Sequence, residues 1–181
     1  KKHKVLLFRG SENNVFNRVL RAAEKHRSKI ICRVTGDCPL IDPKLIDELI
    51  VKFKKKRKIV YASNDFGLPN GMACEIFYLS SLKKCEKFKL NSNDKEHVTL
   101  FLRRNSNKFP NYKVIPKKNN FFPNLDITLD EKEDYQLIKK IYLSFTRRNQ
   151  NLSCRNIVKY MKKNKNLLNI NKNIVRKDIY L

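Results

Sequence analysis

Two aspartates stand directly after predicted strands, where a carboxylate can bind a cation or a ligand. Asp37 follows the apolar residues 30–34 and the dipeptide Thr35-Gly36, and Asp130 ends the alternating stretch 125–130. In open α/β sheets, ligands bind beside the carboxyl ends of the strands. Both residues also have simpler explanations, because Asp37 can make a turn and Asp130 can cap the next helix. The spacing by itself leaves these alternatives open.

The elements that must position these carboxylates alternate between strands and helices. At the start of the chain the order strand, helix, strand, helix, strand implies right-handed crossovers and a largely parallel sheet. The apolar residues Ile30, Ile31, Cys32 and Val34 predict a strand that is buried on both faces. Asp42 is the expected cap of the second helix. Apolar periodicity predicts strands over residues 4–8, 30–34, 58–62, 74–78, 112–115 and 125–130, and helices over residues 15–23, 43–56, 80–88, 95–104, 131–142 and 154–161.

The length and composition are those of a single globular domain. The chain has 181 residues, of which 41% are apolar, and this supports one domain with a real core over residues 1–181. No apolar run reaches the roughly 20 residues of a membrane span, and no signal-peptide pattern opens the sequence. The five cysteines form no Cys-x-x-Cys pair, which argues against a zinc cage or a disulfide framework. We therefore expect a soluble protein of the reducing cytoplasm, with no membrane partner.

The charge balance is strongly basic. There are 41 Lys and Arg residues against 17 Asp and Glu residues, a net charge of +24, which ordinarily points to a polyanionic partner. The basic residues are spread along the chain, and lysine is accompanied by abundant Asn and Ile, so we attribute the charge to composition and a solvated surface. A basic nucleic-acid-binding module remains an alternative, but we do not expect nucleic acid to be a partner. The basic surface would help to attract a nucleoside triphosphate.

Three segments resemble one enzyme family. Residues 33–43, Arg-Val-Thr-Gly-Asp-Cys-Pro-Leu-Ile-Asp-Pro, and residues 95–99, Lys-Glu-His-Val-Thr, are similar to signature segments of the sugar cytidylyltransferases related to the spore-coat polysaccharide protein F group. These enzymes are relatives of acylneuraminate and 3-deoxy-manno-octulosonate cytidylyltransferases. Residues 128–135 resemble the family segment Leu-Thr-Val-Asp-x-Pro-Glu-Asp-Tyr, with Lys132 in place of the usual proline. The resemblance implies a three-layer, nucleotide-diphospho-sugar transferase-like α/β fold with a mostly parallel mixed sheet.

The resemblance also implies an activity. Members of this family transfer CMP from CTP to a sugar or sugar acid and release pyrophosphate, in surface polysaccharide biosynthesis. The aspartate that matches Asp130 is a metal ligand in related cytidylyltransferases. Magnesium needs few protein carboxylates, because it keeps waters and takes other ligands from phosphates. We therefore predict Asp37 and Asp130 as catalytic Mg²⁺ ligands. A glycosyltransferase of the same broad fold remains an alternative, since it would also carry an aspartate after a strand.

Further side chains match the family at its nucleotide or acceptor site. From the sequence alone each has a structural alternative: Ser11 or Asn13 can cap the first helix, Asn70-Gly71 is a good turn, and a lone histidine is more often structural. The predicted binding residues are Arg9, Ser11, Arg18, Arg33, Asn64, Glu75, Glu96 and His97.

One family feature has no counterpart in this sequence. The family opens with a strand and a loop, containing glycine and arginine, that wraps the cytidine and the phosphates, and the present chain begins at what resembles the third strand. We therefore expect an N-terminally incomplete fold and a fragment with weak or no activity, derived from an active parent protein. The carboxyl-terminal helix resembles the part that helps to make the dimer in relatives, so we expect a homodimer.

Overall fold

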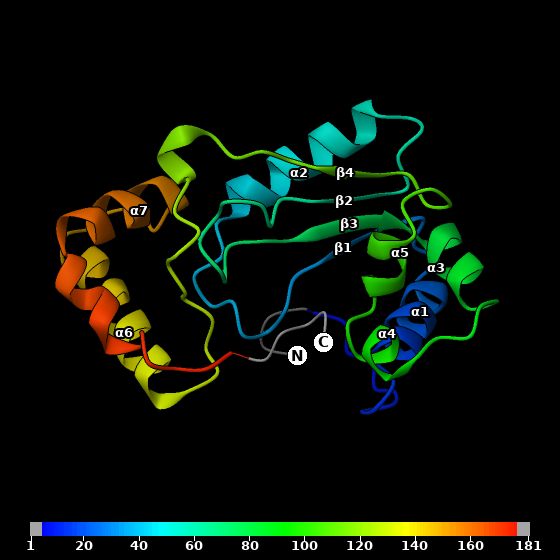
Figure 1. Cartoon of the computed structure of the whole chain (residues 1–181), viewed down its shortest axis with the longest axis horizontal. Helices are drawn as coiled ribbons and strands as arrows, with labels where there is room; N and C mark the ends of the chain where they lie inside the picture. Colours follow the sequence, from blue (N-terminus) through cyan, green and yellow to red (C-terminus); the bar gives the residue numbers. More distant parts are fainter. Residues whose placement is uncertain (1–4, 177–181) are drawn as a thin grey trace.

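The computed structural model describes residues 5–176 and contains a mixed four-stranded sheet (Figure 1). Within the described part the strand order is β1-β3-β2-β4. β2 pairs with β4 in parallel, and β3 runs antiparallel to both β1 and β2. Three strands therefore point the same way, and their carboxyl ends share an edge with the start of β3. The strands are β1 (Ile30–Arg33), β2 (Tyr61–Ser63), β3 (Glu75–Tyr78) and β4 (Asn111–Lys113).

Helices cover both faces of the sheet, so the predicted three-layer α/β class is confirmed. On one face, Phe53 of α2 (Pro43–Lys55) packs with Ala62 and Ile76 of the sheet. On the other face, Tyr61 and Phe77 pack with helical side chains, because successive side chains of a strand alternate between faces. The helices of this second layer are α1 (Val15–Lys25), α3 (Leu79–Cys85), α4 (Ser92–Glu96) and α5 (Leu100–Arg104).

A third group of helices lies beside the sheet, at the left in Figure 1. Its core joins Leu137 and Ile141 of one helix to Ile157 of the next, and both helices pack on Leu125 and Ile127 of the segment that precedes them. This lobe therefore supports the segment that carries Asp130. It is built from η1 (Lys118–Asn120), α6 (Lys132–Thr146), α7 (Cys154–Lys163) and η2 (Lys165–Ile170).

Helix α2 begins where its local signals placed it. Asp42 accepts the backbone N–H of Lys44 at 3.0 Å and is the cap of α2, as predicted. Its other oxygen accepts the N–H of Cys154 at 2.9 Å, at the start of α7. One buried carboxylate therefore joins the layer on the sheet to the lobe beside it. The predicted cap of α1 was wrong, because Asn14, not Ser11 or Asn13, caps that helix.

Three predicted strand features were wrong. Residues 5–8 form no strand, and Val5, Leu6 and Leu7 are 73%, 80% and 74% exposed, while Lys4 lies outside the described residues. Strand formation requires a neighbour that pairs with the backbone, and no described residue pairs with this segment. Strand β1 is not buried on both faces, because Ile30, Ile31 and Arg33 are half-buried and Cys32 is exposed. Residues 125–130 form only an isolated bridge, between Asn70 and Asp126.

No helix among the described residues combines the length and the apolar character needed to cross a bilayer.

The turn at Asn70-Gly71 gives a direct test of this packing. Gly71 has a φ of +91°, and a Cβ there would lie 2.8 Å from the carbonyl carbon and oxygen of Ile127. We expect Gly71→Ala to lower the free energy of unfolding by at least about 2 kcal/mol, because both the backbone angle and the contact are unfavourable. Urea denaturation would measure this.

Gly36→Ala is the matched control, because a Cβ at Gly36 meets nothing within 4 Å. Its unfolding free energy should stay within about 1 kcal/mol of the wild type. Equal stability of the two variants would contradict the close approach of Gly71 to residues 127 and 128.

Candidate active site

Asp37 and Asp130 are brought together at the edge of the sheet. The backbone N–H of Leu129 donates to the carbonyl oxygen of Asp37 at 2.8 Å, which places Asp130 beside the loop after β1. The Cys38 thiol lies close to both carboxylates. Its pKa is raised to about 11, first by burial and then by the negative charges of Asp37 and Asp130. The two residues are therefore neighbours in space, although 93 positions separate them in the sequence.

The two carboxylates have the donor chemistry that magnesium requires. Asp37 accepts only a long contact from the Cys38 thiol, 3.4 Å to Oδ1, and Asp130 accepts from Arg176 at Oδ2. Within residues 5–176 each carboxylate thus keeps one oxygen free of protein partners. No group of three or more His, Cys, Asp or Glu side chains in this part of the chain could hold a metal. Two carboxylates fit a magnesium ion that takes its remaining ligands from waters and phosphates.

Arg176 fixes the segment around Asp130. Its Nε lies 3.1 Å from Asp126 Oδ2, its Nη1 lies 3.2 Å from Asp130 Oδ2, and its Nη2 lies 2.6 Å from Asp134 Oδ1. Asn171 donates to Asp134 as well, at 2.8 Å. No sequence pattern singles out Arg176, because its three partners lie 42 to 50 positions earlier in the chain.

Asp134 is the most strongly stabilised carboxylate of this cluster. Burial alone would raise its pKa, but hydrogen bonds from Arg176, from Asn171 and from the backbone N–H groups of Glu131 and Asp130 lower the pKa to about 2. Asp134 also completes the capping box at the start of α6. Its charge therefore supports the helix that follows Asp130.

Glu75 is the centre of a second polar cluster at the same edge. Arg33 is its register partner across β1 and β3, and the Arg33 Nη1 donates to Glu75 Oε2 at 2.8 Å. The Tyr61 hydroxyl donates to the other oxygen, Oε1, at 2.8 Å, and so does the Thr99 hydroxyl. Two of the predicted binding residues, Arg33 and Glu75, thus contact each other, and Arg33 lies four residues before Asp37.

The predicted helix over residues 95–104 is broken in the middle. Helix α4 ends at Glu96, α5 starts at Leu100, and the N–H of Thr99 donates to the carbonyl of His97 to close a three-residue turn. Its central residue, Val98, has a φ of +49°, which costs about 1–3 kcal/mol for a residue other than Gly.

This break decides which member of the motif contacts Glu75. The buried Thr99 contacts Glu75, whereas Glu96 is exposed and His97 is half-buried without a described polar partner. Sequence reasoning singled out Glu96 and His97 and missed Thr99. A hydroxyl two residues after the histidine was the only available signal.

Asn64 has a structural role. It is buried, and its Oδ1 accepts the N–H of Cys74 at 2.7 Å, which joins the end of β2 to the start of β3. Its Nδ2 is buried without a hydrogen-bond partner among the described residues.

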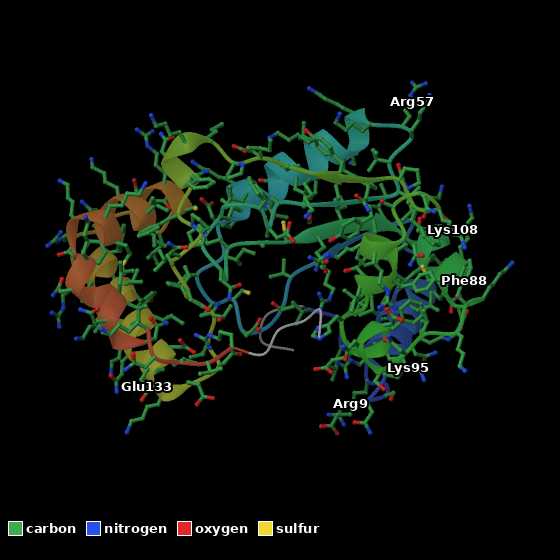
Figure 2. All side chains as sticks on the ribbon, viewed as in Figure 1. Arg9, Arg57, Phe88, Lys95, Lys108 and Glu133 are labelled. Atoms are coloured by element: carbon green, nitrogen blue, oxygen red, sulfur yellow. The ribbon has the colours of Figure 1, made fainter. Side chains whose placement is uncertain are left out.

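The remaining predicted residues lie at the start of α1. Arg18 donates to the carbonyl of Ser11 at 2.7 Å, and the Ser11 hydroxyl accepts the N–H of Asn14 at 3.0 Å. Figure 2 shows Arg9 at the lower margin of the molecule. Within residues 5–176 no hydrogen bond or ion pair joins Arg9, Ser11 or Arg18 to the two aspartates or to Glu75. Their proposed role, like that of Glu96 and His97, stays a prediction from the resemblance.

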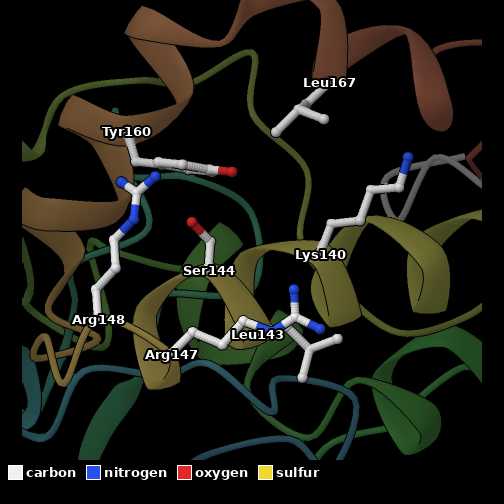
Figure 3. A pocket seen from close by; sticks show the side chains of 7 residues that line it. All are labelled: Lys140, Leu143, Ser144, Arg147, Arg148, Tyr160 and Leu167. Carbon is white, nitrogen blue, oxygen red and sulfur yellow. The ribbon is translucent and has the colours of Figure 1, made fainter.

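Two cavities differ in their relation to this edge. One, of about 360 Å³, opens beside the ends of β2 and β4 and is lined by residues that include Asp65, Phe66, Arg103, Lys113 and Phe121. The other, of about 350 Å³, lies between α6 and α7 (Figure 3) and is lined by Lys140, Ser144, Arg147, Arg148, Tyr160 and two leucines. None of the predicted site residues lines either cavity.

The low pKa of Asp134 makes stability depend on pH. Its folded-state pKa of about 2 is below the ordinary value of 3.8, so its contribution is complete above about pH 5 and is lost as the pH falls toward 2. The difference corresponds to about 2 kcal/mol. The unfolding free energy of the wild type and of Asp134→Asn would be measured in urea at pH 7 and at pH 2. We expect the decrease from pH 7 to pH 2 to be about 2 kcal/mol smaller in Asp134→Asn than in the wild type.

Glu133→Gln is the matched control for this measurement. Glu133 is exposed on the same turn of α6 (Figure 2) and has no hydrogen bond or ion pair within the described residues. Its variant should follow the wild-type pH dependence. If Asp134→Asn did so too, the assigned ionisation of Asp134 would be wrong.

Comparisons with known proteins agree with the resemblance. A cytidylyltransferase family model matches residues 1–174. An uncharacterised protein of Methanocaldococcus jannaschii is 30% identical over 173 residues, which are 96% of this chain and 70% of that protein. The spore coat polysaccharide biosynthesis protein SpsF of Bacillus subtilis is 31% identical over 138 residues, 75% of this chain and 56% of SpsF.

The fold also has a solved counterpart. The structure of a cytidylyltransferase from Leptospira borgpetersenii serovar Hardjo-bovis matches with a TM-score of 0.84 at 30% identity, covering 98% of this chain and 73% of that one. The family expected from the segments around Asp37 and His97 is thus confirmed, and the chain belongs to the cytidylyltransferase family.

Proposed function

We propose that this protein transfers CMP from CTP to the hydroxyl group of a sugar or sugar acid and releases pyrophosphate. The observation that carries this proposal is the meeting of Asp37 and Asp130 at one edge of the sheet, in a chain of the cytidylyltransferase family. The name of the Bacillus subtilis relative supports a role in surface polysaccharide biosynthesis. Membership of this family favours nucleotidyl transfer over the glycosyltransferase and nucleic-acid-binding alternatives.

The reaction forms one bond and breaks another. The acceptor oxygen attacks the α-phosphorus, and the bond from that phosphorus to the bridging oxygen breaks. Pyrophosphate leaves, and the hydroxyl proton passes to water. In such transfers a protein mainly positions the reactants and offsets negative charge. Asp37 and Asp130 would hold Mg²⁺, which supplies positive charge beside the phosphates when bound. Arg33, Glu75 and Asn64 lie at the same edge, where Arg33 is proposed to contact the ligand and Glu75 and Asn64 to support the site.

Removal of either carboxylate tests the proposal. With CTP and a panel of sugars and sugar acids, magnesium-dependent pyrophosphate release by the full gene product should fall about 100-fold or more in Asp37→Ala and in Asp130→Asn. Asp47→Asn, on the exposed side of α2, is the matched control and should keep wild-type turnover. Undiminished turnover in Asp37→Ala would refute the assigned role.

The proposal also covers the oligomeric state and the activity of residues 1–181 by themselves. We propose a cytoplasmic homodimer, from the resemblance and the cysteine usage, and light scattering on the purified protein would measure its mass. The expected weakness of residues 1–181 by themselves is tested when their turnover is compared with that of the full gene product. Equal turnover would refute that expectation.

A further inference from the structure

Arg33 has hydrogen-bonding capacity that the protein does not use. Its guanidinium carries five N–H donors, and its only hydrogen bond or ion pair within residues 5–176 is the one from Nη1 to Glu75. The side chain is only 23% exposed, so most of it is shielded from bulk water. A partly buried arginine whose open donors reach the surface is suited to bind a carboxylate or a phosphate.

Arg176 provides an internal comparison. Its side chain has a similar exposure, 29%, but its Nε, Nη1 and Nη2 all contact carboxylates, those of Asp126, Asp130 and Asp134. The donors of Arg176 are therefore used by the fold. The two arginines have similar exposure, but only Arg33 keeps open donors. The open donors of Arg33 therefore result from the few acceptors around it and not from its burial.

Arg33 is also held in place before any ligand arrives. The Glu75 carboxylate that contacts it is 14% exposed and accepts the hydroxyls of Tyr61 and Thr99 on its other oxygen. Tyr61 and Thr99 are both buried. Together with Arg33 they supply three donors that hold this carboxylate in place. A guanidinium fixed through such a partner needs little reordering when an anion binds.

The backbone turn that brings Thr99 to Glu75 is strained. Val98 is buried and β-branched, yet it adopts a φ of +49° in the turn that carries Thr99 to Glu75. Strained backbone of this kind clusters at binding and active sites, where the surroundings over-determine it. The turn brings Thr99 to Glu75, so its strain is consistent with a built Glu75 cluster.

We propose that Arg33 binds an anionic group of a ligand, and that Glu75, Tyr61 and Thr99 are positioning residues that orient its guanidinium. Arg33 ends β1, four residues before Asp37, so the bound anion would lie beside the two aspartates. On the proposed function, the anion is either a phosphate of the nucleotide or the carboxylate of an acidic acceptor. Both share the chemistry that a guanidinium recognises.

Isothermal titration of the full gene product separates the two sources. Inorganic pyrophosphate and glucuronate are the anionic probes, and cytidine and glucose are their uncharged counterparts. Arg33→Gln should weaken binding of pyrophosphate or of glucuronate about tenfold or more and leave cytidine and glucose unchanged. A loss confined to pyrophosphate identifies a phosphate site, and a loss confined to glucuronate identifies a carboxylate site.

Thr99 variants test the positioning role. Thr99→Val keeps the shape but lacks the hydroxyl, so it should weaken the same anion about threefold, and Thr99→Ser should restore the affinity. Arg57→Gln removes an exposed arginine at the far end of α2 (Figure 2) and should change nothing. Unchanged melting temperatures would show that each variant is folded.

Two results would overturn the inference: anion binding by Arg33→Gln within twofold of the wild type, or no binding of either anion by the wild type. The readout is binding, so it is separate from turnover. Arg33-dependent anion binding without formation of a CMP-sugar would reject the proposed function alone. Turnover that is indifferent to Arg33→Gln, with unchanged anion binding, would reject this inference alone.

Discussion

Three backbone hydrogen bonds hold the site together. The N–H of Asn70 donates to the carbonyl oxygen of Leu125 at 2.8 Å, and the N–H of Ile127 donates to the carbonyl oxygen of Asn70 at 3.0 Å. The N–H of Leu129 donates to the carbonyl oxygen of Asp37 at 2.8 Å. They attach an extended segment to two loops at the edge of the sheet. Asp130 reaches Asp37 because of this attachment, and the lobe of α6 and α7 packs on the other side of the segment.

Carboxylates are scarce in this basic chain, and the buried ones organise helix starts. Asp42 accepts N–H groups from α2 and from the start of α7, Asp94 forms the capping box of α4, and Asp134 forms that of α6. Asp42 is 6% exposed, and Asp94 and Asp134 are fully buried. A buried carboxylate is stable only when it is paired or hydrogen-bonded, and helix N-termini supply the N–H groups that it needs. Cations complete two of these sites, Arg104 at Asp94 and Arg176 at Asp134.

The two arginines at the edge of the sheet show how the same side chain can serve different ends. Arg176 is used fully by the fold, since three carboxylates surround it. Arg33 is oriented by one carboxylate and retains open donors. The net charge of +24 does not distinguish them, because it counts both alike. The contacts of each guanidinium show which of the two arginines has donors left for a ligand.

The sequence by itself determined the family, the α/β class and most helices. Helix α2, with Asp42 as its cap and Pro43 at its start, follows from contacts within a few residues, and such local signals are visible in a sequence. Tertiary structure decided the strands, because a strand needs a neighbour: residues 5–8 and 125–130 have the composition of strands and are not strands in the described fold. It also decided that Thr99, and not Glu96 or His97, reaches Glu75, because the turn at Val98 is maintained by the packing around it. The meeting of Asp37 with Asp130 was predicted from two strand ends, but it results from a loop held by backbone hydrogen bonds that no local pattern encodes.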